Sequence, residues 1–166
     1  MQEMRIELLQ RMPIFGGIRD EILRFLLDLS PVVFAARDDF FFRENDEGQS
    51  MFVLEAGRAA VMKHWQGRDW PLRHLEQGDC FGEMALMDLS PRSASVRAVA
   101  DCAAIELSAA SLYKLYEHDL EQFAIIQMNM GREVCRRLRA TDERLFAAEM
   151  SAEPQTVIME SVKRPG

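Results

Sequence analysis

The segment from Phe81 to Val96, FGEMALMDLSPRSASV, constrains this chain more than any other part of it. Gly82 has no Cβ, so the backbone there can come close to a ligand. Glu83 opens a stretch that is too short for a free-standing helix, and Pro91 ends that stretch and favours an extended Ser90. The sequence therefore predicts a turn, one short helix, and a second turn that enters a strand.

The second turn gathers hydrogen-bond donors suited to an anion. Arg92 brings a planar guanidinium, Ser93 a hydroxyl and Ala94 a backbone amide. Nine residues upstream of Arg92, Glu83 offers an acceptor for a hydroxyl proton. An anion and a hydroxyl bound by one short segment indicate a sugar phosphate. The alternative is that Glu83 and Arg92 only pair with each other on a solvated surface, as many ion pairs do.

This segment resembles the phosphate-binding cassette of the cyclic nucleotide-binding domain family. The family pattern is F-G-E-x-A-L, a short spacer and P-R-[AST]-A-[ST]-V, and every named position is filled here. The resemblance implies that Arg92 binds the cyclic phosphate together with Ser93 and the Ala94 amide, and that Glu83 binds the ribose 2′-hydroxyl. The expected ribose shell is completed by Gly82, Met84 and Ala85. Residues 81–96 are called the cassette below.

The patterns on either side of the cassette predict an α+β fold. Two short helical segments come first, and from residue 32 short apolar segments alternate with turn signals at the spacing of an all-β barrel or roll. A long helical pattern then runs from Asp119 to about Met150, interrupted only by Gly131. We expect an antiparallel, jelly-roll-like β-roll with N-terminal helices, a short cassette helix and a long C-terminal helix. The expected parts are a helical lead-in (1–30), the roll (31–108), C-terminal helices (109–150) and a weakly ordered tail (151–166).

The expected elements follow from apolar spacing and turn residues. Helices are predicted at 4–12, 20–28 and 109–117, the last with Ser108 as its N-cap. Strands are predicted at 32–36, 40–43, 51–55, 58–63, 70–75, 80–81, 96–99 and 103–107, with a polar connection at 66–69. At Asp38-Asp39 the family often has a turn glycine, so this turn is expected to differ.

The resemblance also implies that the purine base is covered by the wall of the roll and by the C-terminal helix. For the wall we expect Val61 or Met62, and for the helix Arg132 or Arg136. The second half of the helix carries an apolar seam at spacings of 4, 3, 4 and 3, formed by Val134, Leu138, Thr141, Leu145 and Ala148. This is an a/d pattern of about two heptads, and it fits either a homodimer or packing on the chain's own roll.

Composition and the remaining motifs exclude other classes. A formal net charge of −7 argues against a nucleic-acid footprint, which would be basic. No apolar run is long enough to span a bilayer, and three widely spaced cysteines indicate reduced thiols in the cytoplasm. The three histidines, His64, His74 and His118, have no metal-ligand spacing, and no catalytic motif is present. We therefore expect no metal, no cofactor and no enzyme activity.

The sequence therefore predicts a cyclic nucleotide sensor. The expected ligand is 3′,5′-cyclic AMP, with cyclic GMP as competitor, and the expected output is movement of the C-terminal helix, read by an unknown protein effector. Family members that act on transcription carry a helix-turn-helix domain after the long helix, and the 166 residues of this chain stop too soon to hold one. We therefore expect either a stand-alone sensor that signals through a partner or a regulatory piece of something larger. The alternative is an interaction or dimerisation domain that keeps the fold without using nucleotide, and a nucleotide-hydrolysing enzyme ranks third.

Overall fold

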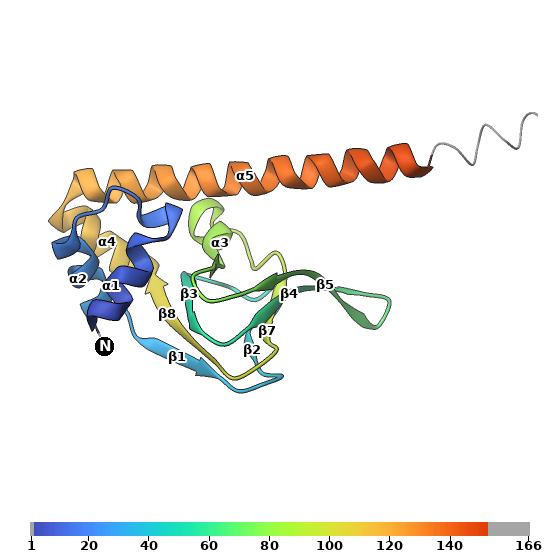
Figure 1. Cartoon of the computed structure of the whole chain (residues 1–166), viewed down its shortest axis with the longest axis horizontal. Coiled ribbons are helices and arrows are strands. Elements are labelled where there is room, and N and C mark those ends of the chain that lie inside the picture. The colour runs from blue at the N-terminus through green and yellow to red at the C-terminus, as the bar shows by residue number, and fades with distance from the viewer. Residues whose placement is uncertain (1, 153–166) are drawn as a thin grey trace, which may run out of the picture. The chain divides into compact units, whose positions relative to one another are not determined.

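The computed structural model describes residues 2–152 (Figure 1). The chain divides into two compact units, Met1–Met130 and Gly131–Gly166, and one helix contributes to both. The helices are α1 (Gln2–Gln10), the 3₁₀ helix η1 (Pro13–Phe15), α2 (Asp20–Asp28), α3 (Glu83–Asp88), α4 (Ala109–His118) and α5 (Leu120–Ala152). The strands are β1 (Val32–Ala35), β2 (Phe40–Phe42), β3 (Ser50–Ala56), β4 (Ala59–Trp65), β5 (Arg68–Leu75), β6 (Cys80–Phe81), β7 (Ser95–Ala98) and β8 (Cys102–Ser108).

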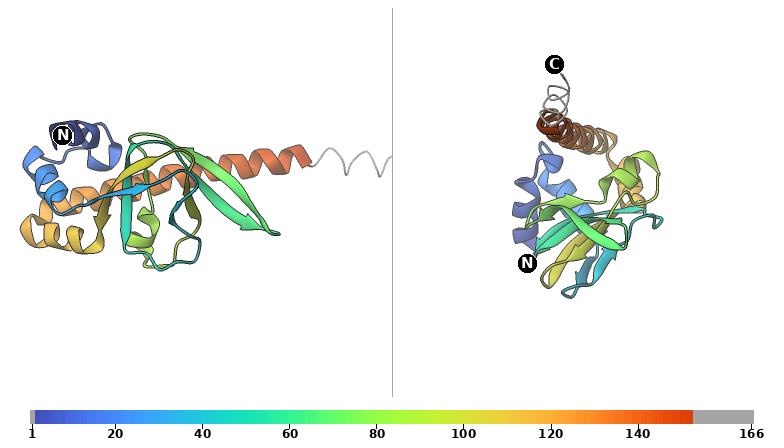
Figure 2. Two further views of the ribbon diagram at one scale, coloured as in Figure 1. Left: turned by 90° about the horizontal axis from the view of Figure 1, so that it is seen from below. Right: turned by 90° about the vertical axis from the view of Figure 1, so that its right-hand side faces the viewer.

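The eight strands form two four-stranded antiparallel sheets, in the orders β1-β8-β3-β6 and β2-β7-β4-β5. Figure 2 shows the two sheets folded against each other, with the β4–β5 hairpin extending beyond them. This arrangement confirms the predicted α+β fold with an antiparallel, jelly-roll-like β-roll, N-terminal helices and a long C-terminal helix.

Strand alternation divides the core into two clusters, because successive side chains of a strand point to opposite faces. Phe52 and Leu54 of β3 join the cluster inside the roll, which we call the roll cluster. Met51 and Val53 of the same strand join the cluster beneath the helices, which we call the helix cluster. The roll cluster comprises Ala35, Phe52, Leu54, Ala59, Leu75, Phe81, Val96, Ala98, Cys102 and Ala104, with Val33, Phe41, Phe42 and Val61 packed against it.

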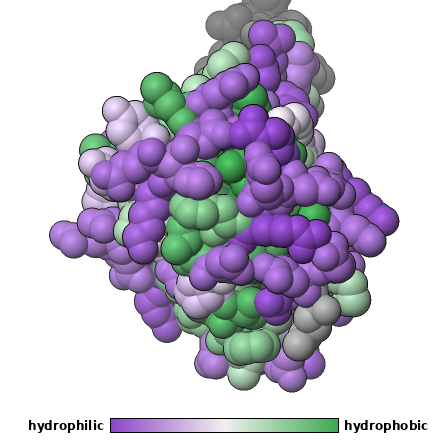
Figure 3. Space-filling model, turned by 90° about the vertical axis from the view of Figure 1, so that its left-hand side faces the viewer, coloured by the Kyte–Doolittle hydropathy of each residue, from purple (hydrophilic) through white to green (hydrophobic). Residues whose placement is uncertain are grey.

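The helix cluster joins the N-terminal helices to α4 and to the first part of α5. Leu9, Ile22, Leu115 and Met130 are among its fully buried members, one from each of these four helices. Figure 3 shows the face of the molecule at this end, which is polar over most of its area with apolar side chains visible between the charged ones. Among the described residues, no helix is long and apolar enough to cross a membrane.

Most predicted elements are present, with shifts at their ends. Helix α2 has the predicted bounds. Ser108 is the N-cap of α4 as predicted, because its hydroxyl oxygen accepts a hydrogen bond from the Ser111 amide at 3.1 Å. The predicted 66–69 connection is wrong: β4 and β5 continue to a tight turn at Gln66 and Gly67, whose φ angles are 50° and 76°. Two successive left-handed residues suit the right-handed twist of a long hairpin.

Two further differences concern α1 and α5. Helix α1 ends at Gln10 rather than at residue 12, because a turn and Pro13 follow it. Helix α5 runs to Ala152, two residues into the predicted tail, and the rest of that tail lies outside the described residues. In the first hairpin turn, Asp38 has a φ of 72°, the left-handed conformation that a glycine often supplies.

Candidate functional site

The cassette begins with a glycine that no other residue could replace without strain. Gly82 has a φ of 81° between β6 and α3. A Cβ on it would lie 2.6 Å from Nη1 of Arg92, 3.2 Å from the Ser50 carbonyl oxygen and 3.3 Å from the Phe42 ring. The missing side chain thus lets the backbone reverse and leaves space for Arg92.

Arg92 returns from the far end of the cassette into this space. Its side chain is buried, and Nη1 donates to the Gly82 carbonyl oxygen at 2.9 Å. Its backbone is bonded to the β2–β3 loop on both sides: its N–H donates to the Asp46 carbonyl at 2.8 Å, and its carbonyl accepts from the Asn45 N–H at 2.8 Å. These bonds hold the two ends of the cassette and the loop together.

The guanidinium of Arg92 lies in a partly desolvated, acidic setting. Burial lowers the pKa of Arg92 from its ordinary value, while the negative charges of Glu106, Asp46 and Glu83 raise it. Glu106 is in turn fixed by Ser50, whose hydroxyl donates to it at 2.6 Å. Within residues 2–152 the Nε of Arg92 is buried without a hydrogen-bond partner. Arg92 therefore keeps unused donor capacity, which is what an anion needs.

The other expected cassette residues lie around Arg92 in two groups. Glu83, Ala85 and Ala94 are buried, and Glu83 opens α3, where a carboxylate suits the helix N-terminus. Met84 and Ser93 are exposed, and the Ser93 hydroxyl donates to the Met84 sulfur at 3.9 Å. The structure thus brings the two ends of the cassette together and buries both the acidic Glu83 and the basic Arg92 between them.

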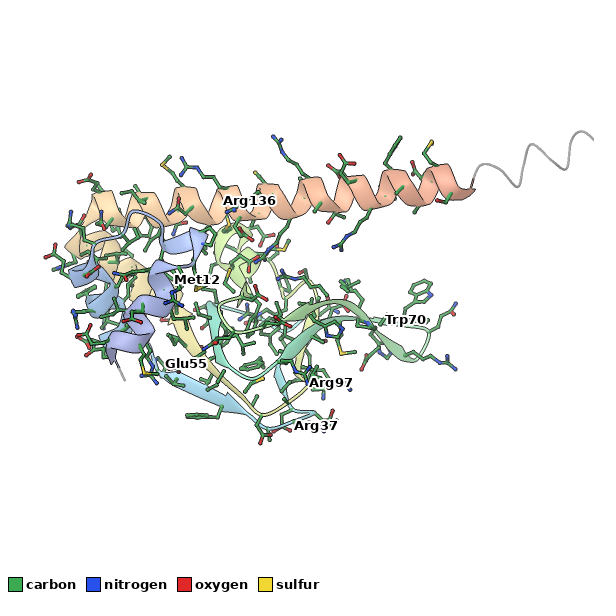
Figure 4. All side chains as sticks on the ribbon, viewed as in Figure 1. Met12, Arg37, Glu55, Trp70, Arg97 and Arg136 are labelled. Carbon is green, nitrogen blue, oxygen red and sulfur yellow. The ribbon has the colours of Figure 1, made fainter. Side chains whose placement is uncertain are left out.

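The four residues expected at the base lie in different surroundings. Val61 packs against the roll cluster, whereas Met62 is the next residue of β4 and therefore points to the opposite face. Val61 and Met62 hence do not line the same wall of the roll. Arg132 and Arg136 belong to the second unit, where Arg136 pairs with Glu133 at 2.7 Å (Figure 4). Contact of these four residues with a base stays a prediction.

Three residues near the cassette were not predicted from the sequence. Phe42 and Gly48 contact the Arg92 side chain: the guanidinium carbon lies 4.0 Å from the Phe42 ring centroid, and a Cβ on Gly48 would overlap the guanidinium. Arg73 of β5 pairs with Val61, which in turn pairs with Val96, so its side chain leaves the sheet on the face of the roll cluster. The sequence could have indicated this face, because Arg73 lies two residues before the fully buried Leu75 and alternate residues of a strand share a face. The pairing of Arg73 with Val61 could not be predicted, because strand register is not fixed by the local sequence.

A family model described as "Cyclic nucleotide-binding domain" matches residues 32–119, which is more than half of the chain. The chain belongs to the cyclic nucleotide-binding domain family. A domain of this family is a regulatory module that binds a cyclic nucleotide, and its homologues include regulators that bind cyclic AMP or cyclic GMP.

Several characterised proteins are similar to this chain. The Cyclic AMP receptor protein of Thermus thermophilus is 28% identical over 131 residues, covering 78% of this chain and 59% of that protein. The cAMP-dependent protein kinase regulatory subunit of Emericella nidulans is 30% identical over 90 residues, covering 54% and 21%. Human cGMP-dependent protein kinase 2 is also 30% identical over 90 residues, covering 53% and 12%. The chain thus spans a minor part of the kinase relatives and somewhat more than half of the receptor protein.

Solved structures agree with this assignment. The Thermus thermophilus Catabolite Activator Protein superposes with a TM-score of 0.73 at 27% identity, covering 82% of this chain and 63% of that one. A cyclic nucleotide-binding domain from Methylobacillus flagellatus KT gives a TM-score of 0.78 at 24% identity, covering 89% and 83%, and shows the same fold.

Proposed function

We propose that this chain is a sensor domain that binds 3′,5′-cyclic AMP at the cassette. The observation that carries the proposal is Arg92, a buried guanidinium with an unpartnered Nε among the described residues, set in the complete cassette of a family member. Arg92 neutralises the cyclic phosphate, and Ser93 and the Ala94 amide complete its hydrogen bonds. Glu83 accepts a hydrogen bond from the ribose 2′-hydroxyl, with Gly82, Met84 and Ala85 supplying backbone around the sugar.

The base lies against apolar wall residues and is covered by the C-terminal helix. Val61 is the wall residue that the roll cluster supports, and Arg132 and Arg136 are the proposed lid contacts. Binding stabilises the covered state by its differential affinity for that state. The resulting movement of the C-terminal helix is the signal, and a protein effector reads it.

Cyclic GMP is the second candidate ligand. The position of Arg73 beside Val61 favours it. Arginine is the side chain that most often reads the O6 and N7 edge of guanine, and Arg73 leaves the sheet beside Val61. If Arg73 reads the base, an Arg73→Ala variant weakens cyclic GMP by about tenfold and leaves cyclic AMP within twofold, which corresponds to about 1.4 kcal/mol of discrimination. An equal loss of affinity for both nucleotides would show that Arg73 does not contact the base.

The second unit supports a homodimer through α5. Leu138 and Leu145, both members of the predicted seam, are exposed over more than half of their surface. We expect a Leu138→Asp, Leu145→Asp double variant to be monomeric in light scattering at concentrations where the wild type is dimeric. Phe146→Asp is the matched control, because Phe146 is equally exposed but lies outside the seam. A monomeric wild type would contradict the dimer.

Calorimetry on nucleotide-stripped protein tests the ligand. Cyclic AMP should bind with a Kd in the micromolar range or tighter, about −8 kcal/mol. 2′-Deoxy cyclic AMP should bind about tenfold or more weakly, because Glu83 then keeps a buried carboxylate with no hydroxyl to accept from. In Glu83→Gln this difference should shrink. Folded protein that binds neither nucleotide at millimolar concentration would instead support the interaction-domain alternative.

The cellular setting is part of the proposal. Within the described residues no disulfide joins Cys80, Cys102 and Cys135, which supports a cytoplasmic protein. Catalysis is not proposed, since a domain of this family is a regulatory module. Among the described residues, no three His, Cys, Asp or Glu side chains could together hold a metal ion.

A further inference from the structure

The guanidinium of Arg92 rests on an aromatic ring rather than on a carboxylate. Its central carbon lies 4.0 Å from the centroid of the Phe42 ring and 5.8 Å from that of Phe52. Within residues 2–152 Arg92 forms no ion pair with an acid, although Asp46, Glu83 and Glu106 are near enough to affect its pKa. The buried positive charge is thus stabilised by a ring face and by the hydrogen bond from Nη1 to the Gly82 carbonyl oxygen at 2.9 Å.

Phe42 is itself held in place by other rings. Its centroid lies 5.9 Å from that of Phe52 and 6.0 Å from that of Phe81, and Phe52 and Phe81 are stacked at 5.3 Å. The register of β2 against β7 shifts between Phe40 and Phe42. Because of this irregularity, the adjacent residues Phe41 and Phe42 both pack against the roll cluster. The ring under Arg92 is therefore fixed before any ligand arrives.

Two glycines close the space on the other sides of the guanidinium. A Cβ on Gly48 would overlap Nε and Cζ of Arg92 and lie 2.8 Å from its Cδ. A Cβ on Gly82 would lie 2.6 Å from Nη1. The guanidinium thus occupies a slot between one ring face and two backbone segments, and packing together with the Nη1 hydrogen bond to Gly82 defines its position.

A ring face stabilises a guanidinium without using its N–H groups. A carboxylate in the same place would accept hydrogen bonds from the fork and cancel the charge, which would compete with a bound phosphate. A π-face attracts the cation from above and leaves the N–H edge available. Only Nη1 is engaged, by the Gly82 carbonyl, and Nε is unpartnered among the described residues.

We propose that Phe42 is a positioning residue for ligand binding: its ring holds the Arg92 guanidinium in place by stacking and leaves the N–H edge for the cyclic phosphate. The inference rests on the proposed function, because it concerns the same anion. It adds a residue that lies outside the cassette, on a strand 50 residues before Arg92 in the sequence.

The test changes the charge distribution of the ring face and keeps the shape of the ring. Pentafluorophenylalanine incorporated at position 42 of the full chain nearly keeps the volume and reverses the charge distribution of the ring face. Calorimetry with cyclic AMP and cyclic GMP should show binding three- to thirtyfold weaker than wild type, which corresponds to about 0.7–2 kcal/mol. The same substitution at position 41 is the matched control, because Phe41 packs on Phe52 and Phe81, at 5.8 and 5.1 Å, and makes no ring contact with Arg92.

Three further variants use ordinary residues. Phe42→Leu should weaken binding to a similar extent, Phe42→Tyr should bind as the wild type does, and Phe41→Leu should stay within twofold. Equal effects at positions 41 and 42, or unchanged affinity with the fluorinated ring at 42, would overturn the role of Phe42 while leaving the proposed function intact. A wild-type protein that binds neither nucleotide would overturn both.

Discussion

Arg92 and Asn129 are both polar and buried, and they differ in what becomes of their hydrogen-bonding groups. The Asn129 side chain on α5 donates to two backbone carbonyls, Ile14 at 3.2 Å and Gly16 at 2.9 Å. It thereby joins the long helix to the turn around η1. Arg92 engages one nitrogen with Gly82 and leaves Nε unpartnered within residues 2–152. The Asn129 amide thus stabilises the fold through its hydrogen bonds, whereas Arg92 keeps a donor available for a ligand.

The difference teaches where this chain tolerates an energetic cost. A buried polar group that is fully hydrogen-bonded adds to stability, whereas a buried charge without full pairing lowers it. The structure accommodates Arg92 by a ring face and two glycines rather than by an acid. Such an arrangement has a purpose when an external anion completes it, which is the role that we propose for the cyclic phosphate.

The sharpest way to break this contrast is to fill the space next to Arg92. In Gly48→Ala the new Cβ would overlap the guanidinium, and no positive φ opposes the substitution. We expect cyclic nucleotide binding to weaken thirtyfold or more, about 2 kcal/mol, because a charged hydrogen-bonding group is displaced. The free energy of unfolding, from urea titration, should change much less.

The matched control for Gly48→Ala is Gly16→Ala, next to Asn129. A Cβ on Gly16 would lie 3.3 Å from the Pro13 carbonyl and 4.0 Å from the Asn129 amide nitrogen, which the turn can absorb with a small shift. Nucleotide affinity should stay within twofold. Equal losses of affinity in both variants would mean that the space around Arg92 is not special.

The second variant acts on the other side of the comparison. Asn129→Leu keeps most of the volume and removes both donors from the Ile14 and Gly16 carbonyls. We expect the free energy of unfolding to fall by about 1–2 kcal/mol, because buried carbonyls are left without partners. Calorimetry at a temperature where the variant is folded should give an unchanged Kd. A weakened Kd with unchanged stability would place Asn129 in the binding machinery.

The smallest effect concerns pH at the start of α5. The Gln122 N–H donates to the Asp119 carboxylate at 3.0 Å, and this bond, together with the Arg19 ion pair, lowers the pKa of Asp119. A lowered folded-state pKa means stability that is present above the unfolded-state value and is lost as pH falls through the folded-state value.

The stability difference between wild type and Asp119→Asn should therefore shrink between about pH 5 and pH 2, where the carboxylate is protonated. Thermal melts across this range measure it. Arg92 stays protonated throughout this pH range. Acid therefore changes the charge at the start of α5 and leaves the charge of Arg92 unchanged. A difference that stays constant across the range would show that the Asp119 charge does not stabilise the fold.

The sequence predicted the cassette more fully than its surroundings. Gly82, Glu83, Arg92 and Ala94 could be identified because the motif is contiguous, and short-range sterics fix its turn. Phe42 under Arg92 could not be identified, because its position depends on a register shift between strands far apart in the sequence.

Strand register explains the other differences as well. The sequence offers Val61 and Met62 as alternatives for the wall. Neighbours on a strand face opposite ways, and only the pairing with Val96 shows that Val61 is the one that faces the roll cluster. The long β4–β5 hairpin was predicted too short, since Arg68 and Asp69 look like turn residues until cross-strand pairing with Trp65 and His64 extends the ladder. Figure 4 shows Trp70 on this hairpin and Arg97 on the roll.

The most direct test of the account measures cyclic AMP and cyclic GMP binding by calorimetry on nucleotide-stripped wild type, Arg92→Ala and Arg97→Ala. Arg97 is the matched control: its Nε is also buried without a hydrogen-bond partner within residues 2–152, but it alternates with Val96 and Ala98 and so points away from the roll cluster. The account predicts that Arg92→Ala loses about 2–4 kcal/mol of binding free energy and that Arg97→Ala binds as the wild type does. Binding that survives Arg92→Ala, or is lost equally in both variants, would contradict it.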